Sequence, residues 1–159
     1  ISFIVHYQNA SIHGIYEESI DLYASVKELT DNFTFCSISF DYDVTGNPNL
    51  KLKNNILAII KEALANIMKH SNATKVIVRI KEHPAMYQVI VEDNGTLPEE
   101  VRLRINQEVN NQGYFNGIGL HNIADRVKAF SGHLNINVDN GFRIFITIPK
   151  QTVPEKKVE

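Results

Sequence analysis

The stretch Ile56–Ser71, ILAIIKEALANIMKHS, decides the fold. At about 3.6 residues per turn its apolar residues fall on one stripe of a helix, which we expect to be buried. Glu62, Asn66 and His70 recur at every fourth position beside this stripe. A polar file next to a buried face is typical of a helix that lines a cleft and presents its side chains to a ligand. The stripe itself consists of Ile56, Ile59, Ile60, Ala63, Leu64 and Ile67.

The composition indicates one globular domain. The chain has 159 residues, 43% hydrophobic and 21% charged, with a net charge of -2. This balance gives no global basic field that would recruit nucleic acid or anionic lipid. The single cysteine, Cys36, excludes an internal disulfide and is predicted to be free and structural. No apolar run approaches the roughly 20 residues that span a bilayer. The sequence opens at Ile1 rather than at a methionine, which suggests a fragment of a longer protein.

Apolar periodicity predicts the remaining elements. A helix is expected within residues 1–35, ending near Phe33, followed by a strand over 36–44. Two runs rich in β-branched residues, 75–81 and 86–93, predict an antiparallel pair. Helices are expected over 99–109 and from Leu120 to a stop at Gly132. Strands over 133–139 and 142–149 should form a hairpin through Asn140-Gly141. This order fits an α+β two-layer sandwich, with one mixed, mostly antiparallel sheet and helices on one face.

Three groups carry the chemistry: the polar file of the central helix, Asp93-Asn94-Gly95 at a strand end, and Gly117-Ile118-Gly119 before a helix. Each alone is typical of a solvated helix face, a turn or a loop. Together they meet the needs of a nucleoside triphosphate. Glycines before a helix expose backbone N–H groups to phosphates, and the Asn66 carbonyl can bind Mg²⁺. The Asp93 carboxylate can accept a hydrogen bond from the exocyclic amine of adenine, close to Gly95.

Three ordered motifs resemble the GHKL ATPase superfamily, which includes histidine kinases, gyrase, Hsp90 and MutL. EALANIMKHS is similar to the N box, VEDNG to the first glycine box, and NGIGLHNIADRVKAFSGHLNI to the second glycine box. Their wording is most similar to two-component sensor histidine kinases of the nitrate-sensor and desaturase-sensor subfamily. The resemblance covers roughly residues 37–150.

The resemblance implies the Bergerat ATP-binding fold, with ATP and Mg²⁺ as cofactors. It makes Asn66 the magnesium ligand, Lys69 a phosphate contact and Asp93 the adenine contact. The nucleotide-binding set it implies is Asn66, Lys69, His70, Asp93, Gly95, Gly117, Ile118, Gly119 and Leu120.

The resemblance implies that the catalytic residues are Glu62, Asn66 and Lys69. Glu62 holds the acidic position of the N box, which in superfamily ATPases belongs to the base that activates water. In a kinase it would instead orient the hydration shell of the metal or the incoming imidazole. His70 either caps the phosphate side of the cleft or is a half-buried histidine at a helix end. Arg126 is predicted to be structural and to pair with a carboxylate.

The sequence departs from the family pattern in two places. The first glycine box commonly reads Asp-x-Gly-x-Gly, but Thr96-Leu97 follow Gly95, so the second glycine is missing. The ATP lid would run over 96–116, with Tyr114 and Phe115 packing on the nucleotide or anchoring the loop. The acceptor histidine of the subfamily is followed by an acidic residue, whereas His6 and His13 are not.

We therefore interpret residues 1–35 as the end of the dimerising, phosphoacceptor helix hairpin, 36–150 as the ATP-binding domain and 151–159 as a frayed tail. The resemblance implies transfer of the γ-phosphoryl group to a histidine of that hairpin, in the same or the sister protomer of a homodimer. A response regulator would receive it next, in the cytoplasm, with any membrane anchor of the parent protein lying outside this sequence. Two alternatives share the fold: a serine kinase of the anti-sigma type, and an inactive ATP-sensing module. Nucleic-acid binding is disfavoured because aromatic and basic residues are not interleaved.

Overall fold

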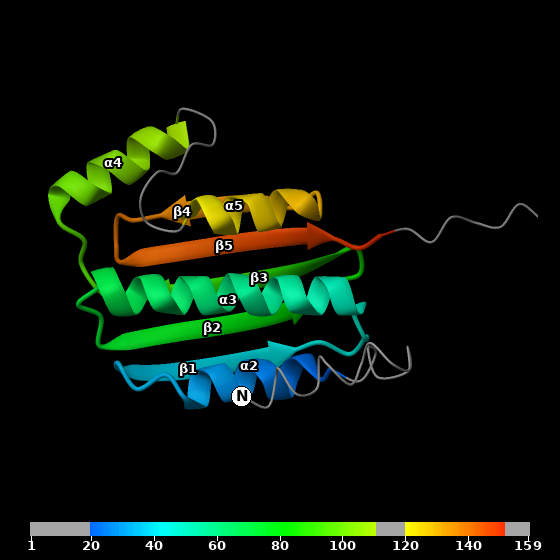
Figure 1. Cartoon of the computed structure of the whole chain (residues 1–159). Helices are drawn as coiled ribbons and strands as arrows, with labels where there is room; N and C mark the ends of the chain where they lie inside the picture. The colour runs from blue at the N-terminus through cyan, green and yellow to red at the C-terminus, as the bar shows by residue number, and fades with distance from the viewer. Residues whose placement is uncertain (1–19, 111–119, 152–159) are drawn as a thin grey trace, which may run out of the picture.

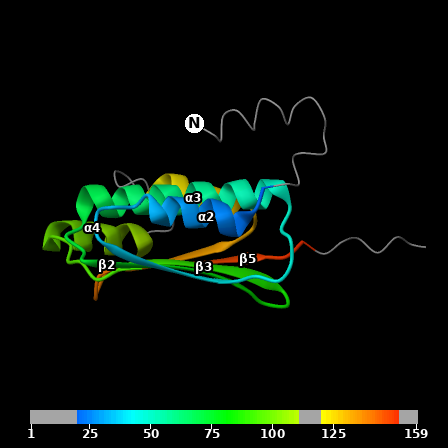
Figure 2. The ribbon, with the colours of Figure 1, turned by 90° about the horizontal axis from the view of Figure 1, so that it is seen from below.

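The protein is a two-layer α+β sandwich. The computed structural model describes residues 20–110 and 120–151, with side chains to residue 107 in the first range. A mixed five-stranded sheet forms one layer, in the order β1-β2-β3-β5-β4. Helices α2, α3 and α5 cover one face of it, which confirms the predicted fold class (Figures 1 and 2). The elements are α2 (Leu22–Asp31), β1 (Ser37–Asp43), α3 (Leu50–His70), β2 (Lys75–Glu82), β3 (Met86–Asp93), α4 (Glu99–Asn110), α5 (Leu120–Ala129), β4 (His133–Asn137) and β5 (Phe142–Pro149).

The central helix α3 lies over the middle of the sheet (Figure 1). Every residue of its predicted apolar stripe is buried. The helix begins at Leu50, before the stretch that opens at Ile56, because the Asn49 side chain caps it by accepting a hydrogen bond from the Leu52 amide at 2.9 Å. The helix is therefore long enough to cross the sheet. Its last two turns carry Asn66 and His70 to the end of the molecule where the pocket lies.

Strand pairing brings distant segments together. β1 and β2 are parallel and connected through α3, whereas β2–β3, β3–β5 and β4–β5 are antiparallel. The predicted pairing of β2 with β3 is confirmed. In the register of the sheet, Asp93 at the end of β3 lies between Val76 of β2 and Phe142 of β5. One end of the sheet thus places Asp93, on the central strand, beside the end of α3.

Two helices flank α3. Leu22 and Val26 of α2 belong to the same buried core as α3, so α2 is part of the sandwich although the sequence groups it with residues 1–35. On the other side, the buried Asn55 side chain of α3 donates to the Arg126 carbonyl of α5 at 2.8 Å. The Arg126 side chain is exposed and forms no ion pair with a carboxylate of the described residues, so the predicted pairing is not found there.

Gly132 has a different role from the one predicted. α5 ends at Ala129, and Ser131, with φ 55°, takes the left-handed conformation that often ends a helix. A Cβ on Gly132 would lie 2.7 Å from the Thr147 carbonyl oxygen of β5. Gly132 therefore allows a close approach to the sheet, and the left-handed residue is a serine.

The last hairpin is shorter than predicted on its first strand. β4 ends at Asn137, whose side chain accepts from the Asp139 amide at 3.0 Å and so begins the turn before residue 139. Gly141 has φ 98°, but Asn140 does not share the positive φ that a two-residue Asn-Gly turn requires, and residues 138–141 separate the two strands. The hairpin is therefore present, but its connection is longer than the predicted two-residue turn. None of the helices described in the two ranges is long and apolar enough to cross a membrane. The predictions for His6, His13, Tyr114, Phe115, the tail and Gly117–Gly119 fall outside the described residues.

Candidate functional site

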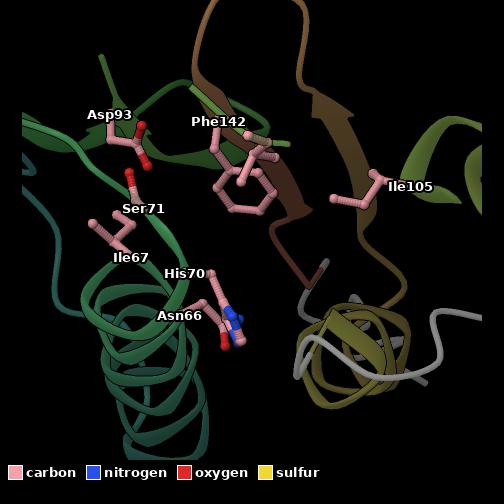
Figure 3. Close-up of a pocket in the computed structure, with 8 residues that line it drawn as sticks. Asn66, Ile67, His70, Ser71, Asp93, Ile105 and Phe142 are labelled. Carbon is pink, nitrogen blue, oxygen red and sulfur yellow. The ribbon is translucent and has the colours of Figure 1, made fainter. Parts of the chain in front are cut away.

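A pocket that is partly open to solvent lies where α3 and β3 end. α3 contributes its last turn to the wall, and α4 and the first residue of β5 contribute the opposite side (Figure 3). The lining residues are Asn66, Ile67, His70, Ser71, Asp93, Leu97, Ile105 and Phe142.

Two buried polar side chains of this pocket lack a hydrogen-bond partner. The Nδ2 atom of Asn66 and the Oδ2 atom of Asp93 are both buried, and no described residue bonds either atom. Their side chains are 6% and 7% exposed. A buried polar atom without a partner costs about 1–3 kcal/mol, so native structures rarely retain one. Two of them on one pocket indicate a ligand with polar groups at both positions.

The Asp93 carboxylate is held in one orientation. Its Oδ1 atom accepts from the Gly95 amide at 2.7 Å, which leaves Oδ2 for a ligand. A Cβ on Gly95 would lie 2.3 Å from the Ser71 hydroxyl oxygen and 2.9 Å from the Ala73 amide nitrogen. Gly95 therefore lets the chain after β3 pass against the end of α3, and this contact brings Asp93 close to the turn that carries Asn66.

The rest of the wall is largely apolar. Ile67 lies on α3, and Phe142 is the first residue of β5. Leu97 lies just before α4, and Ile105 lies within it. Apolar walls around one fixed acceptor suit a planar ring that carries a hydrogen-bond donor. Asp93 can recognise that donor while the walls bury the ring.

The predicted site residues divide into three sets. Asn66, His70 and Asp93 line the pocket together, and Gly95 shapes it. Glu62 is half-buried and Lys69 exposed, and neither belongs to the lining. Leu120 is buried as the first residue of α5, a helix that begins at the end of the molecule where α3 finishes (Figure 1). Gly117, Ile118 and Gly119 fall outside the described residues.

The sequence did not identify Leu97, Ile105 and Phe142 as pocket residues. Ile105 is 1% exposed and is buried although the helix that carries it is mostly polar. Phe142 lies on the pocket because β5 pairs with β3. The position of Phe142 directly after the turn at Gly141 indicates a pocket residue only when the pairing of β3 with β5 is already known.

Asn66 can supply one oxygen to a metal ion. The described residues contain no group of three or more His, Cys, Asp or Glu side chains that could hold a metal. Since no described residue holds the Asn66 Nδ2 atom, the amide is free to turn its oxygen towards a cation. A hard cation such as Mg²⁺ would take its other ligands from phosphates and water.

The free thiol near the site is not a nucleophile. Cys36 is partly buried and unpaired, as predicted. Burial raises the pKa of the Cys36 thiol above its ordinary value, and the charge of Asp93 raises it further. The thiol therefore stays protonated at neutral pH, and the chemistry of the pocket rests on its amide, carboxylate and imidazole groups.

Residues 52–152 match the model of the family described as histidine kinase-, DNA gyrase B-, and HSP90-like ATPase. Sensor histidine kinase DesK of Bacillus subtilis is 30% identical over 118 residues, which are 72% of this chain and 29% of DesK. The nitrate/nitrite sensor protein NarX of Escherichia coli is 28% identical over 137 residues, 82% of this chain and 21% of NarX. The chain thus spans less than a third of these relatives.

Solved structures share the fold. The histidine kinase domain of the blue-light activated histidine kinase from Erythrobacter litoralis superposes with a TM-score of 0.66 at 19% identity, covering 83% of this chain and 62% of that one. The ATP binding domain of PrrB from Mycobacterium tuberculosis gives 0.59 at 20% identity, covering 81% and 90%.

Proposed function

The chain belongs to the family of histidine kinase-, DNA gyrase B- and HSP90-like ATPases, and on that premise we propose that its pocket binds ATP for phosphoryl transfer to a protein histidine. One observation carries the proposal. The sequence motifs assign Asn66 to the metal and Asp93 to adenine. Within residues 20–110 and 120–151 these are the two buried side chains with an unpartnered atom, and both line this pocket.

Each residue has a definable role. Asp93 Oδ2 accepts from the exocyclic amine of adenine, and Ile67, Ile105 and Phe142 bury the ring. Asn66 holds Mg²⁺, which reduces the phosphate charge when it is bound. His70 lies on the wall next to Asn66 along the polar file and contacts the phosphate side.

The phosphate end is assembled from residues beyond the pocket lining. We assign Gly117, Ile118, Gly119 and the amide groups at the start of α5 near Leu120 to the phosphates, with Lys69 as a cationic contact. Glu62, one turn before Asn66 on α3, orients the hydration shell of the metal or the acceptor imidazole. These residues bind, align and neutralise, which is the main requirement of phosphoryl transfer.

The whole protein would act as a sensor histidine kinase. The bond from the γ-phosphorus to the bridging oxygen of ADP breaks, a bond to the histidine nitrogen forms, and the imidazole loses its proton. A dimerisation hairpin of the same or the sister protomer supplies that histidine, and a response regulator receives the phosphoryl group from it. The similar proteins DesK and NarX are a sensor histidine kinase and a nitrate/nitrite sensor protein, which favours this reading over a serine kinase. Because ATP is the substrate, we assign the domain to the cytoplasm.

The test is ATP binding by calorimetry in the presence of Mg²⁺. Asp93→Asn should weaken ATP binding at least about a hundredfold, because an NH₂ group then faces the adenine amine. Asp41→Asn is the matched control. Asp41 is an exposed carboxylate on the edge strand β1, and it pairs with Arg79 of β2. It should bind like the wild type. Equal affinity of all three proteins would refute the proposal.

The metal and base contacts need separate measurements. Asn66→Ala should weaken ATP binding with Mg²⁺ and have little effect in EDTA, because its oxygen acts through the ion. GTP should compete poorly, since its ring places a carbonyl oxygen where adenine has an amine. A GTP affinity equal to that of ATP would show that Asp93 does not select the base.

A further inference from the structure

Asn72 and Thr96 form a reciprocal pair of hydrogen bonds beside the pocket. The Thr96 amide donates to Asn72 Oδ1 at 2.7 Å, and Asn72 Nδ2 donates to Thr96 Oγ1 at 3.0 Å. The two residues are 24 positions apart in the sequence. We call this pair the Asn72–Thr96 clasp. It joins the turn after α3 to the segment that leads from β3 into α4.

A second set of bonds joins the same two segments one step further from α4. Asn94 Oδ1 accepts from the Thr74 and Lys75 amides at 2.9 Å each, and Asn94 Nδ2 donates to Thr74 Oγ1 at 2.9 Å. Gly95 lies between the two sets, where an added Cβ would be 3.0 Å from Asn72 Oδ1. Asn94 therefore joins the start of β2 to the end of β3. The clasp holds Thr96, two residues further along the chain.

The clasp lies directly before α4 in the sequence. α4 starts at Glu99, three residues after Thr96, and Leu97 between them already lines the pocket. Among the described side chains of α4, Ile105 alone is buried, whereas Leu103 is 52% exposed. Figure 1 shows α4 set apart from the other helices, beyond the end of α3. With so small a packed surface, the position of α4 depends strongly on the fixed start of the helix.

We propose that Asn72 is a positioning residue of the nucleotide site, because the clasp holds α4 with Leu97 and Ile105 against the pocket before ATP arrives. This inference rests on the proposed function. Leu97 stands where family members commonly have a second glycine, and the Asn72 side chain holds the residue directly before it, Thr96. A wall that is already ordered costs less to order when a ligand binds, so the clasp contributes to ATP affinity without touching ATP.

The first measurement needs no nucleotide. Asn72→Ala should raise hydrogen exchange of the α4 amides, and trypsin cleavage after Arg102 and Arg104, by about tenfold, since two hydrogen bonds are lost. Asn72→Asp should restore slow exchange, because the Thr96 hydroxyl can then donate to the carboxylate. Thr96→Val should behave like a weaker Asn72→Ala. Its control is Thr45→Val, which removes one hydroxyl bond to Glu82 at the opposite end of the sheet.

The second measurement is ATP affinity with Mg²⁺ for the same variants. Asn72→Ala should raise the Kd of ATP by roughly three- to tenfold and change the melting temperature little, because both clasp residues are exposed. Unchanged α4 exchange in Asn72→Ala, or faster exchange with unchanged ATP affinity, would overturn the role of Asn72 while the ATP site stands. Failure of the wild-type chain to bind ATP would overturn the proposed function and this inference with it.

Discussion

Single residues without a side chain bring the segments of the pocket into contact. A Cβ added to Gly95 would lie 2.3 Å from the Ser71 hydroxyl oxygen. Gly141, at the tip of the last hairpin, would place a Cβ 2.1 Å from the Asp93 carbonyl oxygen. The backbone of Asp93 and the chain just after it are thus both packed closely against other segments, and both close contacts depend on glycine.

Gly95→Ala should lower the free energy of unfolding by about 1–3 kcal/mol and weaken ATP binding, because the new methyl group pushes backbone apart next to Asp93. Gly46→Ala is the control. Its Cβ would meet the end of the flexible Glu82 side chain, 2.6 Å from Oε1, far from the pocket. Urea unfolding and calorimetry measure both effects, and a Gly95→Ala protein as stable as Gly46→Ala would contradict the expected clash.

Ser131→Gly should raise the free energy of unfolding by about 0.5–1 kcal/mol, because Ser131 adopts φ 55°, which costs a residue with a Cβ more than it costs glycine. Ser25→Gly, inside α2, should lower it by a similar amount, since glycine is unfavourable within a helix. Urea denaturation of both variants gives the comparison. A loss of stability in Ser131→Gly would show that its side chain matters more than its backbone.

Residue type explains how much of the site the sequence predicted. Asn66 and Asp93 carry an amide and a carboxylate, whose binding chemistry can be predicted from the sequence, and the structure brings both into one pocket. Ile105 and Phe142 are ordinary apolar residues, whose role depends on where α4 and β5 lie. The roles of the glycines at 117 and 119 stay predictions.

Among the elements, the contact between α3 and α5 contains a buried polar bond. The Asn55 side chain donates to the Arg126 carbonyl, which lies in the last turn of α5. Carbonyl groups in the last turn of a helix have no partner within the helix. α3 therefore supplies a C-terminal cap for its neighbour.

Asn55→Ala should lower the free energy of unfolding by about 1–3 kcal/mol, since the Arg126 carbonyl is left buried without its donor. Asn54→Ala, at the half-buried neighbouring position, should change it by less than about 0.5 kcal/mol. Thermal and urea unfolding of the two variants provide the measurement. Equal effects would mean that the bond between the helices contributes nothing specific.

The sequence predicted most elements, but their pairing only in part. Periodicity identified β2, β3 and β5 to within a residue or so, because their alternate residues are buried. The β3–β5 pairing was not predictable, since it joins strands separated by two helices. Apolar periodicity gave no start for α3, because residues 50–55 include lysines and asparagines, of which Lys53 and Asn55 are nevertheless buried.

For the whole molecule, Glu82 ties three segments together at the end of the sheet far from the pocket. Its carboxylate accepts from the Gly46 and Thr45 amides at 2.9 and 3.0 Å, and from Lys150 Nζ at 3.1 Å. The bond from the Gly46 amide, followed by the Lys150 ammonium and the Thr45 bonds, lowers the pKa of Glu82 to about 2. Glu82 thereby joins the β1–α3 connection, β2 and the segment after β5.

The stability of the protein should fall in acid for this reason. A carboxyl group whose folded pKa is about 2 rather than the ordinary 4.5 contributes stability above pH 4.5, and loses it as the pH falls towards 2. Glu82→Gln should be less stable than the wild type at pH 7, and the difference should shrink between pH 4.5 and 2. Urea unfolding at a series of pH values measures this. A constant difference would show that the charge of Glu82 is irrelevant.

The pairing of β3 with β5 has a consequence for how the domain can vary. Asp93 and Phe142, the two ends of the intervening chain, are register partners in adjacent strands, so the sheet closes a long excursion at its base. Because the sheet holds both ends of this chain, we expect insertions between α4 and α5 to change ATP affinity while the scaffold keeps its melting temperature.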